Sequence, residues 1–263
     1  MTPRLRLRET LTEALWRAPE VLNGAGGSIA AAAVLSLVIG LTPASGWLRT
    51  AEYALLAVAL LMALGATTRI GVAGDKAGGK ALGLGPAGLQ LTRTEARLLG
   101  ATLLCGLFLV IMIALLGMTA LALFGGAGLD AEAIRLRDWG AAGPAWKLWL
   151  LAGVGVIVVG APVVFALRLS LYAQATVSTG RMISLTATRL TNGSMLPLLA
   201  GLVLVQLPGI AWALLAVTGV LPAKAALAAG VVLIAVVQAP LKAAFLGAAF
   251  RRLDRPDEDL APL

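Results

Sequence analysis

The chain has 263 residues, of which 59% are apolar and 13% charged, with a formal net charge of +8. A soluble domain carries about 25% charged residues, so this composition is typical of a membrane protein and excludes a sizeable soluble domain. The sequence has no histidine and a single cysteine, which excludes a serine triad, the usual zinc sites and a disulfide framework. We expect no cofactor, no metal and no nucleic-acid partner, and attribute the basic excess to membrane topology.

The first 27 residues lack the apolar core and cleavage site of a signal peptide. Thr10 and Glu13 fit a capping box, which predicts that a helix begins there. Apolar residues follow at helical spacing and Trp16 suits the headgroup level, so we predict an interfacial amphipathic helix within residues 1–27. Pro19 is expected to bend or end this helix. An ordinary turn before the first span is the alternative.

Six apolar runs predict membrane spans. They lie at about 28–44, 51–67, 96–124, 146–167, 196–220 and 223–239. The glycine-rich connection 68–91 lacks the spacing of a phosphate-binding loop, and we predict a solvated loop there. Thr92 and Glu95 form a second capping box, which predicts the start of the third long helix. The sixth span is expected to continue as an amphipathic helix to Leu253, before a loose tail at 254–263.

Lysine and arginine residues are divided unequally between the two sides of these spans. The N-terminus, 68–97, 168–189 and the C-terminus together hold 15, whereas the opposite connections hold five, with Lys242 left out as intramembrane. Since basic loops remain in the cytoplasm, we predict that both termini and the polar stretch 168–195 are cytoplasmic. The expected fold is all-α: one polytopic domain, residues 1–263, with six transmembrane helices and interfacial helices on the cytoplasmic side. The expected location is a bacterial inner (cytoplasmic) membrane.

Polar residues beside prolines interrupt the last two predicted spans, at Gln206-Leu-Pro208 and Gln238-Ala-Pro240. Transporters break helices in this way to bind solutes, so a solute site is one hypothesis. The expected depths of Gln206 and Gln238 in the membrane argue against a site that both residues share. Gln206 lies about 16 Å in from the cytoplasmic side, whereas Gln238 lies close to that side and Lys242 can snorkel out. In the structural alternative, each glutamine caps carbonyl groups freed by its proline.

The polar stretch between the fourth and fifth spans carries a sequence pattern. It consists of Arg168-Leu-Ser-Leu171, Thr179-Gly180, Arg189-Leu-Thr-Asn-Gly193 and Leu198-Leu199. This pattern resembles bacterial inner-membrane proteins similar to the membrane domain found with some glycerophosphodiester phosphodiesterases. The motif residues are Arg168, Thr179, Gly180, Arg189, Thr191 and Gly193. Gln174 stands where the family usually has proline, and Thr179 where it has glutamate. The resemblance implies a six-span membrane part without the catalytic barrel.

The same stretch is predicted to be a surface-lying or re-entrant segment. Met182, Ile183, Leu185 and Leu190 would dip inward, while Arg168, Arg181 and Arg189 reach lipid phosphates. In the alternative, these arginines only fix topology.

Three function classes remain open. The first is a non-enzymatic envelope protein that binds anionic membrane lipid, or assembles with copies of itself or with other membrane proteins. The second is a transporter or channel subunit with polar sites at Gln206 and Gln238. The third is a membrane-embedded lipid-modifying enzyme, for which no set of acid, base and metal ligands can be assembled from the sequence.

Overall fold

The computed structural model describes residues 5–43, 45–183, 191 and 193–254. Throughout these ranges the chain is helical and forms no strand. Six segments are long and apolar enough to cross a membrane. They are Leu7–Leu41, Trp47–Ala73, Pro86–Gly126, Ala145–Thr179, Met195–Val217 and Ala223–Asp254. For the described part of the chain, the predicted all-α class and the six membrane-length segments are confirmed.

The helices follow one another as antiparallel pairs. The first half contains α1 (Leu7–Leu41), α2 (Trp47–Ala73), the short α3 (Lys76–Ala81), the 3₁₀ turn η1 (Pro86–Gly88) and α4 (Arg93–Gly126). A short α5 (Ala131–Arg135) leads into α6 (Ala145–Leu169) and α7 (Tyr172–Thr179). The last part contains α8 (Met195–Val217), α9 (Ala223–Leu233), the π-helical turn η3 (Ile234–Gln238) and α10 (Ala239–Asp254).

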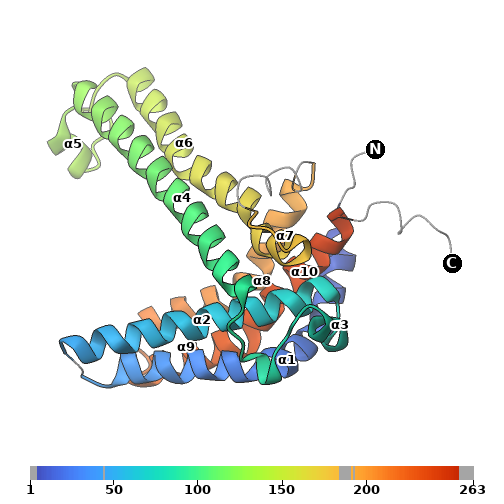
Figure 1. The fold of residues 1–263 in the computed structure, drawn as a ribbon. Coiled ribbons are helices and arrows are strands. Elements are labelled where there is room, and N and C mark those ends of the chain that lie inside the picture. Colours follow the sequence, from blue (N-terminus) through green and yellow to red (C-terminus); the bar gives the residue numbers. More distant parts are fainter. Residues whose placement is uncertain (1–4, 44, 184–190, 192, 255–263) are drawn as a thin grey trace.

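The helices form a body and an arm (Figure 1). In the body, α1, α2 and α10 pack together with α8 and α9, whereas α4 and α6 pair with each other and lean away as the arm. The buried residues of α4 all lie in its first four turns: Glu95, Leu98, Ala101 and Cys105. The arm is therefore joined to the body at one end. We call this the basal end, which comprises the start of α1, the α2–α4 connection, α7 and the end of α10; the opposite end is the distal end.

Glycines allow the body helices to approach closely. A Cβ atom added to Gly247 of α10 would lie 2.4 Å from the carbonyl oxygen of Gly71 in α2, and one added to Gly201 of α8 would lie 2.0 Å from the Phe245 ring. The arm glycines differ, because an added Cβ would meet no described atom within 4 Å. They are Gly106, Gly117, Gly153, Gly155 and Gly160. Close backbone packing therefore holds the body together but is absent from the arm.

The N-terminal segment differs from its prediction. Residues 7–41 form one continuous helix that contains Pro19, not an interfacial helix followed by a separate span. Pro19 removes the hydrogen bond to the carbonyl of Leu15, and both residues are exposed, where solvent or headgroups can satisfy that carbonyl. The capping box at Thr10 is also wrong. The helix begins at Leu7, and the Thr10 hydroxyl donates to the carbonyl of Arg6 at 2.9 Å.

The connection 68–91 is packed against the body, contrary to the predicted solvated loop. α2 continues to Ala73 and ends at Gly74, whose left-handed conformation (φ +91) closes the helix. The glycines that suggested a mobile loop instead allow close packing. A Cβ atom at Gly88 would lie 2.8 Å from the Cα atom of Ala25 in α1. Glycine spacing without knowledge of these contacts cannot distinguish a solvated loop from a tightly packed one.

Candidate functional site

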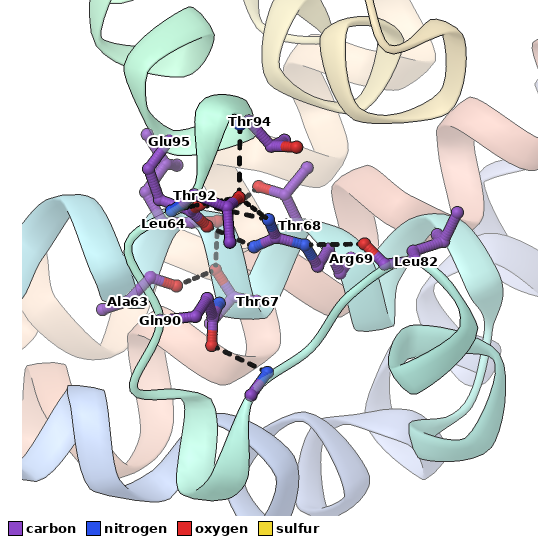
Figure 2. Close-up of polar contacts among 11 residues, drawn as sticks. Ala63, Leu64, Thr67, Thr68, Arg69, Leu82, Gln90, Thr92, Thr94 and Glu95 are labelled. Atoms are coloured by element: carbon purple, nitrogen blue, oxygen red, sulfur yellow. Dashed lines mark hydrogen bonds and ion pairs between the residues drawn. The ribbon is translucent and has the colours of Figure 1, made fainter.

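The basal end contains a buried ion pair between α2 and α4 that the sequence analysis did not identify. The side chains of Arg69 and Glu95 are each only 1% exposed. Figure 2 shows the Arg69 guanidinium facing Glu95, with Nη1 donating to Oε1 and Nη2 donating to Oε2 at 3.2 Å. Its Nε donates to the carbonyl of Leu82 at 3.0 Å. One arginine therefore joins α2, the connection and α4.

The predicted capping box at Thr92 is confirmed and belongs to the same network. The Thr92 backbone N–H and hydroxyl donate to Glu95 Oε2 at 2.8 and 2.6 Å, and the hydroxyl accepts from Arg69 at 3.2 Å. Gly65 provides the space, since a Cβ atom there would lie 2.4 Å from Glu95 Oε1. The two charged groups form a bidentate pair and make further hydrogen bonds. These interactions offset the desolvation cost of burying both charges.

A second ion network joins the start of α1 to the end of α10. Glu13 accepts from Arg251 at 2.6 Å and from Arg252 at 3.3 Å, while Arg252 also reaches Glu9 at 2.8 Å. Arg251 donates to the carbonyl of Gly71, and Arg17 donates to the carbonyl of Gly74. These carbonyls lie at the C-terminus of α2, where cations are favourable. The two networks make the basal end the most strongly connected part of the fold.

The stretch expected to be surface-lying or re-entrant is described only in part: Leu185 and Leu190 lie outside the described residues, whereas α7 is described and buried. In α7, the residues Ala173, Gln174, Ala175, Thr176 and Val177 are buried against the body and arm. Beyond α7, the Thr176 hydroxyl pairs with the backbone of Ile183, and Ile183 packs on the core, whereas Met182 is 54% exposed. The predicted surface-lying segment is therefore corrected for α7: its apolar and small residues fit between helices.

The three arginines expected to bind lipid have different positions. Arg168 is exposed in the last turn of α6, and Arg181 is exposed after Gly180 ends α7 in the left-handed conformation (φ +61). Arg189 lies outside the described residues. Of the other motif residues, the Thr179 hydroxyl donates to the carbonyl of Ala175 at 2.8 Å. Thr191 is buried and Gly193 has a φ of +82.

A further contact brings basic residues of α4 to this stretch. Nη1 of Arg97 donates to the carbonyl of Gly180, the residue before Arg181. Arg93 lies one turn before Arg97 on the same face of α4, and both are exposed. From the sequence, Arg93 and Arg97 were interpreted only as basic residues that fix the orientation of the chain in the membrane. No local pattern reveals the contact, because 83 residues separate Arg97 from Gly180.

The two glutamines of the last spans lie at the same level, so the depth argument against a shared site is wrong. The sixth apolar segment runs from Ala223 to Asp254, which places Gln238 near its middle. A Cβ atom on Gly209 would lie 2.4 Å from Gln238 Oε1, and Gly209 follows Gln206 by one turn. Gln206 Oε1 is buried and, among the described residues, accepts no hydrogen bond.

The sixth span continues past Pro240 as a helix to Asp254, which confirms the predicted continuation to Leu253, and a π-helical turn precedes the proline. The N–H of Ala239 donates to the carbonyl of Ile234, five residues earlier, because the proline ring disturbs the regular register. Lys242, one turn after Gln238, is exposed. The described part of the chain contains no group of three acidic, histidine or cysteine side chains that could hold a metal.

Comparisons with known proteins leave the family open. No family model matches the chain, no curated protein matches it, and no solved structure matches it. The resemblance of residues 168–199 to the membrane domain associated with phosphodiesterases stays a prediction.

Proposed function

We propose that the chain is a non-enzymatic, multi-pass protein of a bacterial cytoplasmic membrane, and that its basal end faces the cytoplasm and binds anionic lipid. One observation carries this proposal. Seven exposed basic side chains at the basal end form no ion pair with any residue in the described ranges. They are Arg8, Lys76, Lys80, Arg93, Arg97, Arg168 and Arg181.

The dimensions and aromatic residues support this placement. Tryptophans are exposed near the distal end: Trp47 at 76%, Trp146 at 64% and Trp149 at 78%. From Trp146 to Arg168, α6 rises about 33 Å, close to the ~30 Å thickness of a bilayer core. Tryptophan at one interface and arginine at the other are typical anchors of a spanning helix. Apolar side chains lie among the basic residues of the basal end, as Leu89 (48% exposed) and Leu91 (62%) show.

The proposed function predicts selective retention of lipid. Protein solubilised in a mild detergent should carry a higher fraction of anionic phospholipid than the membrane from which it was taken, as measured by mass spectrometry of extracted lipids. The enrichment should decrease when the protein is washed at 1 M salt, where exposed charges are screened beyond about 3 Å. A retained fraction equal to that of the host membrane would contradict lipid binding.

The orientation is tested by cysteine labelling after replacement of Cys105. Lys76→Cys places a thiol on α3 at the basal end, and Arg135→Cys places one on α5 at the distal end; both positions are exposed. An impermeant thiol reagent should label position 135 in intact cells and reach position 76 only after lysis. Labelling of position 76 from outside would show that the proposed orientation is reversed.

Solute transport is the second candidate function. It is favoured by the Gln206 Oε1, which is buried and accepts no hydrogen bond from a described residue, and by Gln238, which lies at the same level in a π-helical turn. If Gln206 is only structural, Gln206→Leu should leave the protein equally stable or more stable by about 1 kcal/mol, because a buried acceptor without a donor is costly. Thermal unfolding in detergent measures this change. Loss of a cellular phenotype at a normal protein level would instead support transport.

A further inference from the structure

We propose that Arg93, Arg97 and Arg181 bind the phosphate of one anionic phospholipid, whose acyl chain lies along the exposed face of α4. This inference rests on the proposed lipid-binding function and assigns it to one site. The proposed site lies at the junction of arm and body and does not include Arg168 or Arg189, which the sequence had suggested as lipid contacts.

The Arg97–Gly180 hydrogen bond brings the three arginines together. Because Gly180 ends α7 in the left-handed conformation, the chain leaves α7 at the point where Arg97 contacts it, and Arg181 is the next residue. Arg93 precedes Arg97 by four residues, which places both on one face of α4. Arg97 uses one nitrogen for Gly180, so its guanidinium retains N–H groups for a phosphate.

The local carboxylate does not neutralise this cluster. Glu95 lies between Arg93 and Arg97 in the sequence, but it is buried on the opposite side and fully engaged by Arg69 and Thr92. Arg93, Arg97 and Arg181 form no ion pair with any other described residue. A phosphate diester supplies the missing negative charge, and guanidinium groups can bind its oxygens bidentately.

An apolar face continues from the arginines along α4. Four exposed apolar residues follow 10, 11, 14 and 18 residues after Arg97, about three to five helical turns further along: Leu107 (56% exposed), Phe108 (39%), Ile111 (46%) and Leu115 (62%). Near the arginines, Met182 covers Gly100, where an added Cβ would lie 2.9 Å from its sulfur. From Arg97 to Ile111 the helix rises about 21 Å, enough to pass the ~15 Å depth of one leaflet.

The distribution of charge favours a lipid, and not a second copy of the chain, as the molecule that covers this face of α4. A cationic cluster at one end of a purely apolar helix face complements a molecule with one anionic head and one apolar chain. A second copy would have to place a basal carboxylate, such as the exposed Asp75, against three arginines although the chain carries a net charge of +8, and the crosslinking outcome below tests that occupant.

The test compares two triple variants that remove equal charge. One is Arg93→Gln/Arg97→Gln/Arg181→Gln; the matched control is Arg135→Gln/Arg137→Gln/Lys224→Gln, at exposed positions outside the basal end. Detergent-purified proteins are titrated with phosphatidylglycerol and phosphatidylcholine and analysed by native mass spectrometry. Each basic group near an anionic phosphate contributes roughly fivefold in affinity, so the site variant should bind phosphatidylglycerol about a hundredfold more weakly, and the control should remain near wild type.

The outcomes separate the two proposals. A site variant that binds phosphatidylglycerol as tightly as wild type would overturn this site but leave the proposed function intact, whereas equal weakening in both variants would overturn both. A wild-type protein that does not prefer phosphatidylglycerol would overturn the proposed function itself. If loss of the Arg97–Gly180 contact prevents folding, the double variant Arg93→Gln/Arg181→Gln retains that contact and should still weaken binding about 25-fold. A photo-crosslinker at position 107 that yields a protein dimer instead of a lipid adduct would also overturn the proposal.

Discussion

Replacing Arg69 with alanine should destabilise the protein by about 3–5 kcal/mol, because Glu95 would be left charged, buried and without its cation. The pair is 1% exposed on both sides, so water cannot replace the lost guanidinium. Equilibrium unfolding in mixed SDS micelles measures the free energy. The matched control is Arg93→Ala, which removes an exposed arginine from the neighbouring helix and should change stability by less than about 0.5 kcal/mol.

A double variant separates charge burial from packing. Arg69→Met/Glu95→Met removes both charges together and should recover most of the loss, since an apolar pair of similar volume carries no desolvation cost. Equal stability of Arg69→Ala and Arg93→Ala would mean that the ion pair does not join α2 to α4 in solution.

Adding one methyl group at Gly247 should destabilise the protein by about 1–3 kcal/mol through overpacking. In Gly247→Ala, the new Cβ would lie 2.4–2.6 Å from backbone atoms of Gly71, so α10 would have to move away from α2. The control is Gly153→Ala in α6, where the Cβ meets no described atom within 4 Å. That substitution should stabilise the helix by up to about 1 kcal/mol, because alanine has the higher helix propensity.

The two alanine substitutions are therefore expected to change stability in opposite directions, although both are Gly→Ala changes in membrane-length helices. Thermal unfolding of both variants in one detergent gives the comparison. A stabilised Gly247→Ala protein would show that α2 and α10 do not cross at this distance.

Apolar runs predicted the long helices well, because a segment that crosses hydrocarbon must satisfy its backbone polar groups internally. The capping box at Thr92 was also predicted correctly, because its two hydrogen bonds join residues only three apart in the sequence. The same sequence pattern at Thr10 gave a wrong prediction of where the first helix begins. Leu5, two residues before α1 begins, donates its backbone N–H to the Ser194 hydroxyl at 3.1 Å, so a contact with a distant part of the chain helps determine where α1 begins.

The candidate site could be predicted only in part. Arg181 was predicted to contact lipid, whereas Arg97 was not, because its contact with the residue before Arg181 depends on how α4 meets α7. Arg69 was counted as one of many loop charges, although the 26 residues that separate it from Glu95 fold back to form the buried pair. Gln238 was placed too near the surface because the apolar run was taken to end at about residue 239, whereas the membrane-length segment extends from Ala223 to Asp254.

The contacts between α1, α2 and α10 also set the order in which the fold can be completed. Glu13 is 238 residues from Arg251, and the carbonyl of Gly71 is 180 residues from the same arginine. At ribosomal rates of about 5–20 residues per second, roughly 10–40 s pass between synthesis of Gly71 and arrival of its partner. During this interval the pair formed by α1 and α2 lacks the helix that completes its interface, so its contacts with α10 form only after nearly the whole chain has been synthesised.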